Sequence, residues 1–200
     1  MTEEVMESLP EKLKPHICTL KRASMDTTKN IPMCESGIEV VNFDKIPNEF
    51  ARGRGWSSVP KSNDALYKDV DGKWFFVEFK NGTIKTHEIY RKLYDSLIML
   101  LEWGIFPSFD FIRNHVNYIL VYNGEKTERI QPSVNRDATY EYFTQLAKQE
   151  EKLFGIEKFE KYLFNETHTY TPDLFEKILS VRKRRKNVVI LRCIKRVYAT

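Results

Sequence analysis

The stretch WFFVEFK at residues 74–80 limits the possible folds of this chain more than any other. Successive residues of a β-strand point to opposite faces, so Glu78 and Lys80 would share one face with Trp74 and Phe76. Because the other face is wholly apolar, we expect a central strand that is covered on both sides. Burial of a carboxylate there is costly unless the group is paired or binds a metal ion. The alternative is that Glu78 and Lys80 lie at the end of the strand and reach water or each other.

The turn before this strand predicts which residue lies opposite Glu78. The sequence VDG at residues 70–72 suits a three-residue hairpin loop, in which a type I turn is followed by glycine in the left-handed region. In that register Asp69 pairs with Lys73, and Asp64 lies opposite Glu78 with Cβ atoms about 4.5–5.5 Å apart. A two-residue Asp-Gly turn would shift the register by one residue and place Asp64 on the other face.

The three-residue turn would thus bring two carboxylates and the ammonium of Lys80 together, with no sulfur or imidazole ligand nearby. Ligation by oxygen alone, with room left for water, suits Mg²⁺ or Mn²⁺. Two further acid-x-Lys triplets, at residues 71–73 and 150–152, fall in a turn and on a helix, where we expect solvated surface.

Hydrophobic periodicity predicts the elements around this hairpin. Apolar residues recur at three- and four-residue spacing over residues 83–103 and predict a long helix, with Glu88/Lys92 and Arg91/Asp95 as ion pairs on its outer face. We expect a loop at 19–37, strands at 38–43, 56–59, 117–122 and 187–197, and helices at 47–52, 137–153, 155–166 and from 172 onward.

These elements predict an α/β fold, a small mixed β-sheet flanked by α-helices. The chain has 200 residues, of which 42% are hydrophobic, so we expect one domain over residues 1–200 with a single sizeable core. Residues 1–36 show no clear pattern, and residues 124–200 are predicted to form a helical extension with a terminal strand.

Cysteine usage and the N-terminus indicate a cytoplasmic protein. The three cysteines form no CxxC pair, which is typical of free thiols in a reducing compartment. The N-terminus is acidic without an apolar segment, and the longest purely apolar run, 97–101, is too short to cross a membrane. A net charge of +4 does not by itself identify a partner.

Asp64, then Glu78-x-Lys80 on the next strand, then a long amphipathic helix and a further strand, resembles the PD-(D/E)xK phosphodiesterase superfamily. That group includes restriction endonucleases, Holliday-junction resolvases and many phage and defence nucleases. The resemblance covers residues 45–123 and implies a restriction-endonuclease-like core. The proline that usually precedes the aspartate directly lies four residues upstream here, at Pro60.

By this resemblance, Asp64, Glu78 and Lys80 would be the catalytic residues. Asp64, Glu78 and the backbone carbonyl of Phe79 would hold Mg²⁺ or Mn²⁺, with Glu49 as the candidate acid on the first helix. The ion would polarise the scissile phosphate and activate a bound water. Lys80 would position that water or stabilise developing negative charge. The electrostatic role is favoured because a free lysine has a pKa near ~10.4.

Basic and aromatic residues outside the motif are candidates for binding nucleic acid. Arg52 and Arg54 can contact phosphates and Trp56 can stack on a base; the alternative is a solvated loop anchored by a buried Trp56. Lys85 and Arg91 lie near the start of the long helix, where the resembled fold often lends a polar residue to the site. A run of five basic residues can track a phosphate backbone or complement a helix dipole: Arg182, Lys183, Arg184, Arg185 and Lys186.

The expected function is metal-dependent hydrolysis of nucleic-acid phosphodiester bonds, with DNA favoured over RNA. The alternative is an inactive nucleic-acid-binding or protein-interaction module with the same fold, and a homodimer is compatible with either. The sequence contains no GxGxxG, P-loop or nucleophile-elbow motif, which argues against nucleotide cofactors and serine hydrolases.

Overall fold

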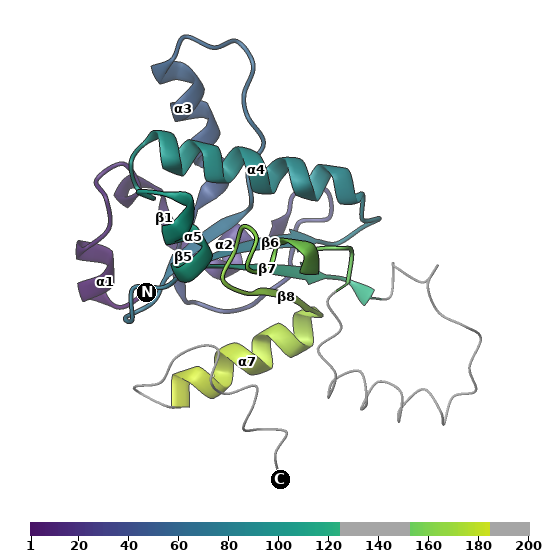
Figure 1. Cartoon of the computed structure of the whole chain (residues 1–200). Helices are drawn as coiled ribbons and strands as arrows, with labels where there is room; N and C mark the ends of the chain where they lie inside the picture. The colour runs from purple at the N-terminus through teal and green to yellow at the C-terminus, as the bar shows by residue number, and fades with distance from the viewer. Residues whose placement is uncertain (125–152, 185–200) are drawn as a thin grey trace, which may run out of the picture.

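A six-stranded mixed sheet with strand order β1-β4-β5-β6-β7-β8 lies at the centre of this α/β protein (Figure 1). A computed structural model describes residues 1–124 and 153–184 of the chain. The pairs from β1 to β6 are antiparallel, whereas β6, β7 and β8 run parallel. The strands are β1 Ile17–Thr19, β4 Glu39–Asn42, β5 Ala65–Lys68, β6 Trp74–Lys80, β7 Val116–Tyr122 and β8 Thr167–Tyr170.

Helices cover both faces of the sheet, with α4 on one side and α7 on the other (Figure 1). Trp74 and Phe76 of β6 join the core cluster that contains the apolar face of α4. Phe75 and Val77 join a second cluster with Phe175 of α7. The prediction of a central strand buried on both faces is therefore confirmed. The helices are α1 Glu3–Glu7, α2 Leu20–Ala23, α3 Ile46–Gly53, α4 Thr86–Glu102, α5 Phe109–His115 and α7 Pro172–Arg184.

The β5–β6 hairpin has the predicted three-residue turn. Lys68 pairs with Trp74, and the backbone N–H of Asp69 donates to the Lys73 carbonyl at 2.9 Å. Gly72 has a φ of +77°, the left-handed conformation that glycine adopts without steric cost. The Asp69 carboxylate accepts the backbone N–H of Lys73 at 2.8 Å and so closes the turn from inside. The register of β6 is thereby fixed by local chemistry.

Helix α4 follows the prediction over most of its length but differs in one ion pair. Its buried stripe includes Ile89, Leu93, Leu97 and Leu100, as the periodicity predicts. Arg91 and Asp95 form the expected pair, with 3.7 Å between Nε and Oδ2. The other predicted pair is wrong: Glu88 contacts Lys85 at 3.2 Å, and Lys92 turns inward.

The N-terminal segment contains structure that its sequence does not announce. The predicted loop at 19–37 contains α2 and a two-stranded sheet of β2 Met25–Asp26 and β3 Ile31–Pro32. Just before it, β1 extends the main sheet by pairing with β4. These strands have two or three residues each, so their pairing partners, and not a periodic pattern, hold them in place.

Two other predictions are wrong because tertiary contacts override local pattern. Residues 56–59 form no strand, and the helix expected at 155–166 is a single 3-10 turn, Glu157–Phe159. Phe154 and Lys161 on either side have positive φ angles, which interrupt helical geometry. After this turn the chain forms β8, a buried strand parallel to β7.

The predicted helix at 137–153 lies almost wholly outside the described residues, and the strand at 187–197 lies entirely outside them. In the described ranges, no helix is both long and apolar enough to span a membrane.

Candidate functional site

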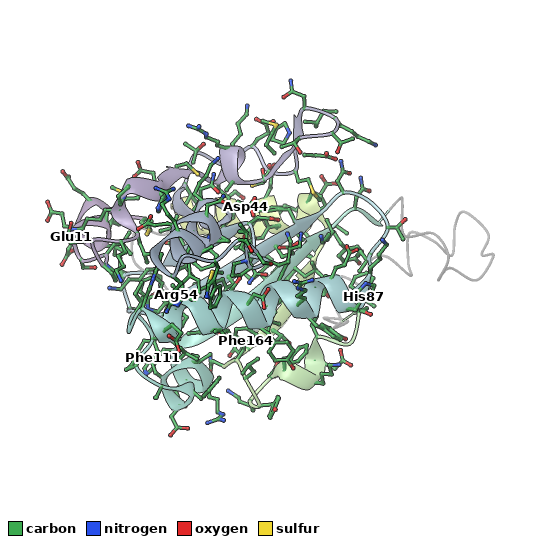
Figure 2. All side chains as sticks on the ribbon, turned by 90° about the horizontal axis from the view of Figure 1, so that it is seen from above. Glu11, Asp44, Arg54, His87, Phe111 and Phe164 are labelled. Carbon is green, nitrogen blue, oxygen red and sulfur yellow. The ribbon has the colours of Figure 1, made fainter. Side chains whose placement is uncertain are left out.

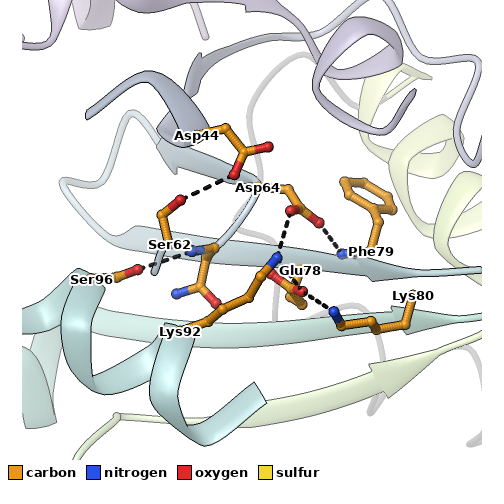
Figure 3. A network of polar contacts seen from close by, with 9 residues as sticks. Asp44, Ser62, Asp64, Glu78, Phe79, Lys80, Lys92 and Ser96 are labelled. Carbon is orange, nitrogen blue, oxygen red and sulfur yellow. Dashed lines mark hydrogen bonds and ion pairs between the residues drawn. The ribbon is translucent and has the colours of Figure 1, made fainter. Parts of the chain in front are cut away.

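Asp64 and Glu78 lie opposite each other at the junction of β5 and β6 (Figure 3). Ala65 pairs with Val77, so the preceding residue of one strand faces the following residue of the other. Both carboxylates contact the same ammonium, that of Lys92 on α4: its Nζ lies 3.0 Å from Asp64 Oδ1 and 2.7 Å from Glu78 Oε1. The hairpin turn therefore determines which acids meet, and α4 supplies the cation between them.

Glu78 is fully buried and only half satisfied. Its Oε1 contacts Lys92 and also Lys80, whose Nζ lies 3.1 Å away. Its Oε2 has no hydrogen-bond partner among the described residues. Burial raises the pKa of Glu78 to about 8, repulsion from Asp64 acts in the same direction, and Lys92 and Lys80 oppose the shift. A buried oxygen with free lone pairs can bind a cation or accept a hydrogen bond from an ordered water.

Lys92 is a residue of this site that the sequence pattern did not predict. Burial alone would lower the pKa of Lys92, but attraction from Asp64 and Glu78 outweighs burial and raises it, so the side chain stays charged. One signal was present in the sequence: Lys92 lies three residues after Ile89 and four before Ser96, both buried on the inner face of α4. A lysine in that stripe requires an acidic partner on the sheet.

Asp64 also organises the backbone of β6. Its Oδ2 accepts the backbone N–H of Phe79 at 2.6 Å. The N–H and C=O of one strand residue point to the same side, so the Phe79 carbonyl faces the β5 side as well. Asn63, opposite Phe79 in this register, donates its backbone N–H to Ser96 Oγ at 3.0 Å and not to the sheet.

A third carboxylate approaches from the turn before α3. The Asp44 carboxyl group points toward Ser62 and Asp64 (Figure 3), and Ser62 Oγ donates to Asp44 Oδ1 at 3.0 Å. Desolvation of that carboxyl group, followed by repulsion from Asp64, raises the pKa of Asp44. Glu49, the predicted acid of this region, instead contacts His16, with 2.9 Å between Oε2 and Nε2.

Two further buried polar groups near the carboxylates lack a partner within the described part of the chain. They are the side-chain amide of Asn63, next to Asp64, and the hydroxyl of Tyr118 on β7. Burial raises the pKa of Tyr118 strongly, and repulsion from Glu78 and Asp64 adds to the shift. The phenol is therefore close enough to the two carboxylates to interact with them electrostatically. Buried groups of this kind usually bind ordered water or an ion.

The predicted nucleic-acid residues lie in different settings. Arg52 is exposed and Arg54 is tied to Glu102 at 2.9 Å, while Trp56 is 53% exposed and not a buried anchor. Lys85 occupies the N-cap position of α4 without a side-chain capping bond, and its ammonium lies 3.2 Å from Glu88. The Arg91 side chain is 63% exposed on α4. The side chains of the basic run lie outside the described residues: Arg182, Lys183, Arg184, Arg185 and Lys186.

Within residues 1–124 and 153–184, no three His, Cys, Asp or Glu side chains form a group set to hold a metal ion. Two acids, Asp64 and Glu78, meet where β5 and β6 pair, and the Phe79 carbonyl lies beside them. A scan against protein-family models and searches of the curated proteins and the solved structures found no match to this chain. Its function is therefore inferred from the chemistry of the site.

Proposed function

We propose that this protein is a metal-dependent phosphodiesterase that hydrolyses nucleic acid, with DNA favoured over RNA, at a PD-(D/E)xK-like site on a restriction-endonuclease-like core. The observation that carries this proposal is the opposition of Asp64 and Glu78 with two ammonium groups beside them. The distances from the Glu78 carboxylate are 2.7 Å to Lys92 and 3.1 Å to Lys80. The roles of Asp64, Glu78 and Lys80 are those that the resemblance implies.

The donor set fits Mg²⁺ or Mn²⁺. The unpartnered Glu78 Oε2, a carboxylate oxygen of Asp64 and the Phe79 carbonyl are all hard oxygen ligands. Mg²⁺ is usually bound through one or two carboxylates and keeps several waters, so two acids are enough. When bound, the ion would polarise a phosphate oxygen and lower the pKa of a coordinated water.

The two lysines would hold negative charge in place during the reaction. Both ammonium groups lie on the face of β6 that carries Glu78, and both side chains are only 20% exposed. In a poorly solvated site, preorganised cations stabilise the charge that develops on a phosphate far more strongly than they do in water. Lys92 is the stronger candidate for orienting Asp64 and Glu78, since it contacts both acids.

One observation favours the alternative, a catalytically inactive binding or interaction module. The Lys92 ammonium already contacts both carboxylates, and a closed ion-pair network of this kind can serve folding alone. The two functions differ in whether the carboxylates bind a divalent cation.

The test is titration of Mn²⁺ into the wild type, Asp64→Asn and Glu78→Gln by calorimetry, with cleavage of plasmid and single-stranded DNA measured in parallel. Asp71→Asn, an exposed acid in the adjacent turn, is the matched control. We expect binding in the wild type and control, loss of binding in both site variants, and a fall in cleavage of about 100-fold or more. Absence of Mn²⁺ binding in the wild type would refute the catalytic proposal and favour the binding module.

A further inference from the structure

A pocket of about 500 Å³ lies between the loop that follows α3 and the exposed side of α4. Residues 55–60 form its loop wall, and Arg91 and Asp95 form its helix wall. The volume is within the range of small-molecule sites, ~300–1,000 Å³, and is large enough for a nucleotide. None of the residues that line this pocket belongs to the carboxylate site described above.

Trp56 provides a fixed aromatic surface in this pocket. Its indole packs edge-on against Phe50, with ring centroids 5.7 Å apart and an interplanar angle of 74°. Its backbone N–H donates to the Ala51 carbonyl at 3.0 Å. The Arg54 guanidinium lies 3.7 Å from the Phe50 ring and is tied to Glu102, so this side of the loop is braced against α4. Trp56 nonetheless remains 53% exposed.

The helix wall carries two complementary charged groups. Arg91 is exposed and its Nε lies 3.7 Å from Asp95 Oδ2, a long contact that leaves most guanidinium donors available for a phosphate. Asp95 Oδ2 also accepts the backbone N–H of Lys61 at 2.9 Å, which ties the loop to the helix. Carboxylates of this kind can accept a hydrogen bond from the exocyclic amino group of a base.

Both walls of the pocket are close in sequence to residues of the carboxylate site. The loop wall continues through Lys61 and Ser62 to Asp64, and Ser62 is fixed by Asp44. On the helix wall, Arg91 is followed directly by Lys92. In the view of Figure 2, Arg54 and Asp44 lie on the same side of α4.

We propose that this pocket binds one unpaired nucleotide of the substrate strand, with its base stacked on Trp56 and a flanking phosphate at Arg91. The inference rests on the proposed function and makes it more specific: the substrate would be single-stranded nucleic acid or the unpaired end of a duplex. A base can stack on a protein side chain in this way only after it leaves the base stack of the duplex.

The test is binding of labelled 12-nucleotide DNA and RNA strands, single-stranded and duplex, to the full chain in EDTA, followed by fluorescence anisotropy. We expect single strands to bind more tightly than duplex and to quench tryptophan fluorescence. Trp56→Ala should weaken single-strand binding by about tenfold and remove the quenching, whereas Trp56→Phe should retain most of the affinity. Arg91→Met should weaken binding and reduce its salt dependence. The matched controls are Tyr162→Ala, an exposed aromatic residue away from the pocket, and Arg22→Met, an exposed arginine.

The outcomes separate this inference from the proposed function. Unchanged single-strand binding in both Trp56→Ala and Arg91→Met would overturn the pocket assignment, even if Asp64→Asn still abolished Mn²⁺-dependent cleavage. Equal affinity for duplex without quenching would overturn it as well. Quenching that depends on Trp56 in a protein without cleavage activity would support the pocket and refute the hydrolase. Comparison of the affinities for the DNA and RNA strands shows which of the two nucleic acids the pocket prefers.

Discussion

The Lys92 ammonium lies 2.7 Å from the Glu78 carboxylate, which is fully buried on the central strand. The same ammonium contacts Asp64 at 3.0 Å, so one side chain of α4 contacts an acid from each strand of the hairpin. Removal of one partner from a buried ion pair is more destabilising than removal of the whole pair, since the other charge is left without compensation. The site and the packing of α4 on the sheet are therefore coupled.

Lys92→Met should consequently destabilise the metal-free protein by about 3–5 kcal/mol. Urea denaturation in EDTA measures the change in the free energy of unfolding. The matched control is Lys29→Met, an exposed lysine between β2 and β3, which should change it by less than about 0.5 kcal/mol. If the proposed cation site exists, Mn²⁺ should restore part of the stability of Lys92→Met by binding to the uncompensated acids. Equal stability of the two lysine variants would contradict this account of Lys92.

Glu78→Gln should gain stability relative to the wild type as the pH rises. The pKa of Glu78 is raised from 4.5 to about 8, so the folded wild type keeps a proton that the unfolded chain releases. The stabilisation from this proton is complete below pH 4.5 and is lost as the pH rises through about 8. Glutamine carries no such proton, so the difference in melting temperature, variant minus wild type, should be larger at pH 8.5 than at pH 5 in EDTA. Glu4→Gln, at an exposed position, is the matched control.

Sequence alone was sufficient for the hairpin and its acids because their placement depends on local rules. The turn chemistry of residues 70–72 fixes the register, and strand alternation then fixes the face on which Asp64 and Glu78 meet. The long helix and the buried strand β7 were predictable for a similar reason, since their apolar periodicity extends over many residues.

Lys92, Asp44 and the edge strands were not predictable in this way. Lys92 stands four residues after Glu88, the spacing of a surface ion pair, and this pattern competes with its position between Ile89 and Ser96 on the inner face of α4. Asp44 reaches the site through the path of the chain between β4 and α3, which no periodic pattern encodes. β1 and β8 are strands of three and four residues that exist through pairing with β4 and β7.

Gly72→Ala tests how much the left-handed turn contributes to stability. The φ of +77° at this position costs an L-residue about 1 kcal/mol, so the substitution should lower the free energy of unfolding by that amount. Gly82→Ala is the matched control, because it has open space around it and no positive φ, and it should be close to neutral. Urea denaturation compares the two variants. Equal effects would mean that the positive φ of Gly72 carries no cost for an L-residue at this position.

Asp44→Asn and Glu49→Gln decide which acid of the α3 region serves the site. Asp44 is held toward Asp64 by Ser62, whereas Glu49 is engaged with His16. If the carboxylates bind Mn²⁺, a third negative charge beside Asp64 strengthens binding by attraction and by ordering the water around the ion. We therefore expect Asp44→Asn to weaken Mn²⁺ binding about tenfold in calorimetry at pH 7.5 and Glu49→Gln to leave it unchanged. The reverse order of effects would assign the role to Glu49, as the resemblance implied, and would require α3 to turn toward the hairpin when the cation binds.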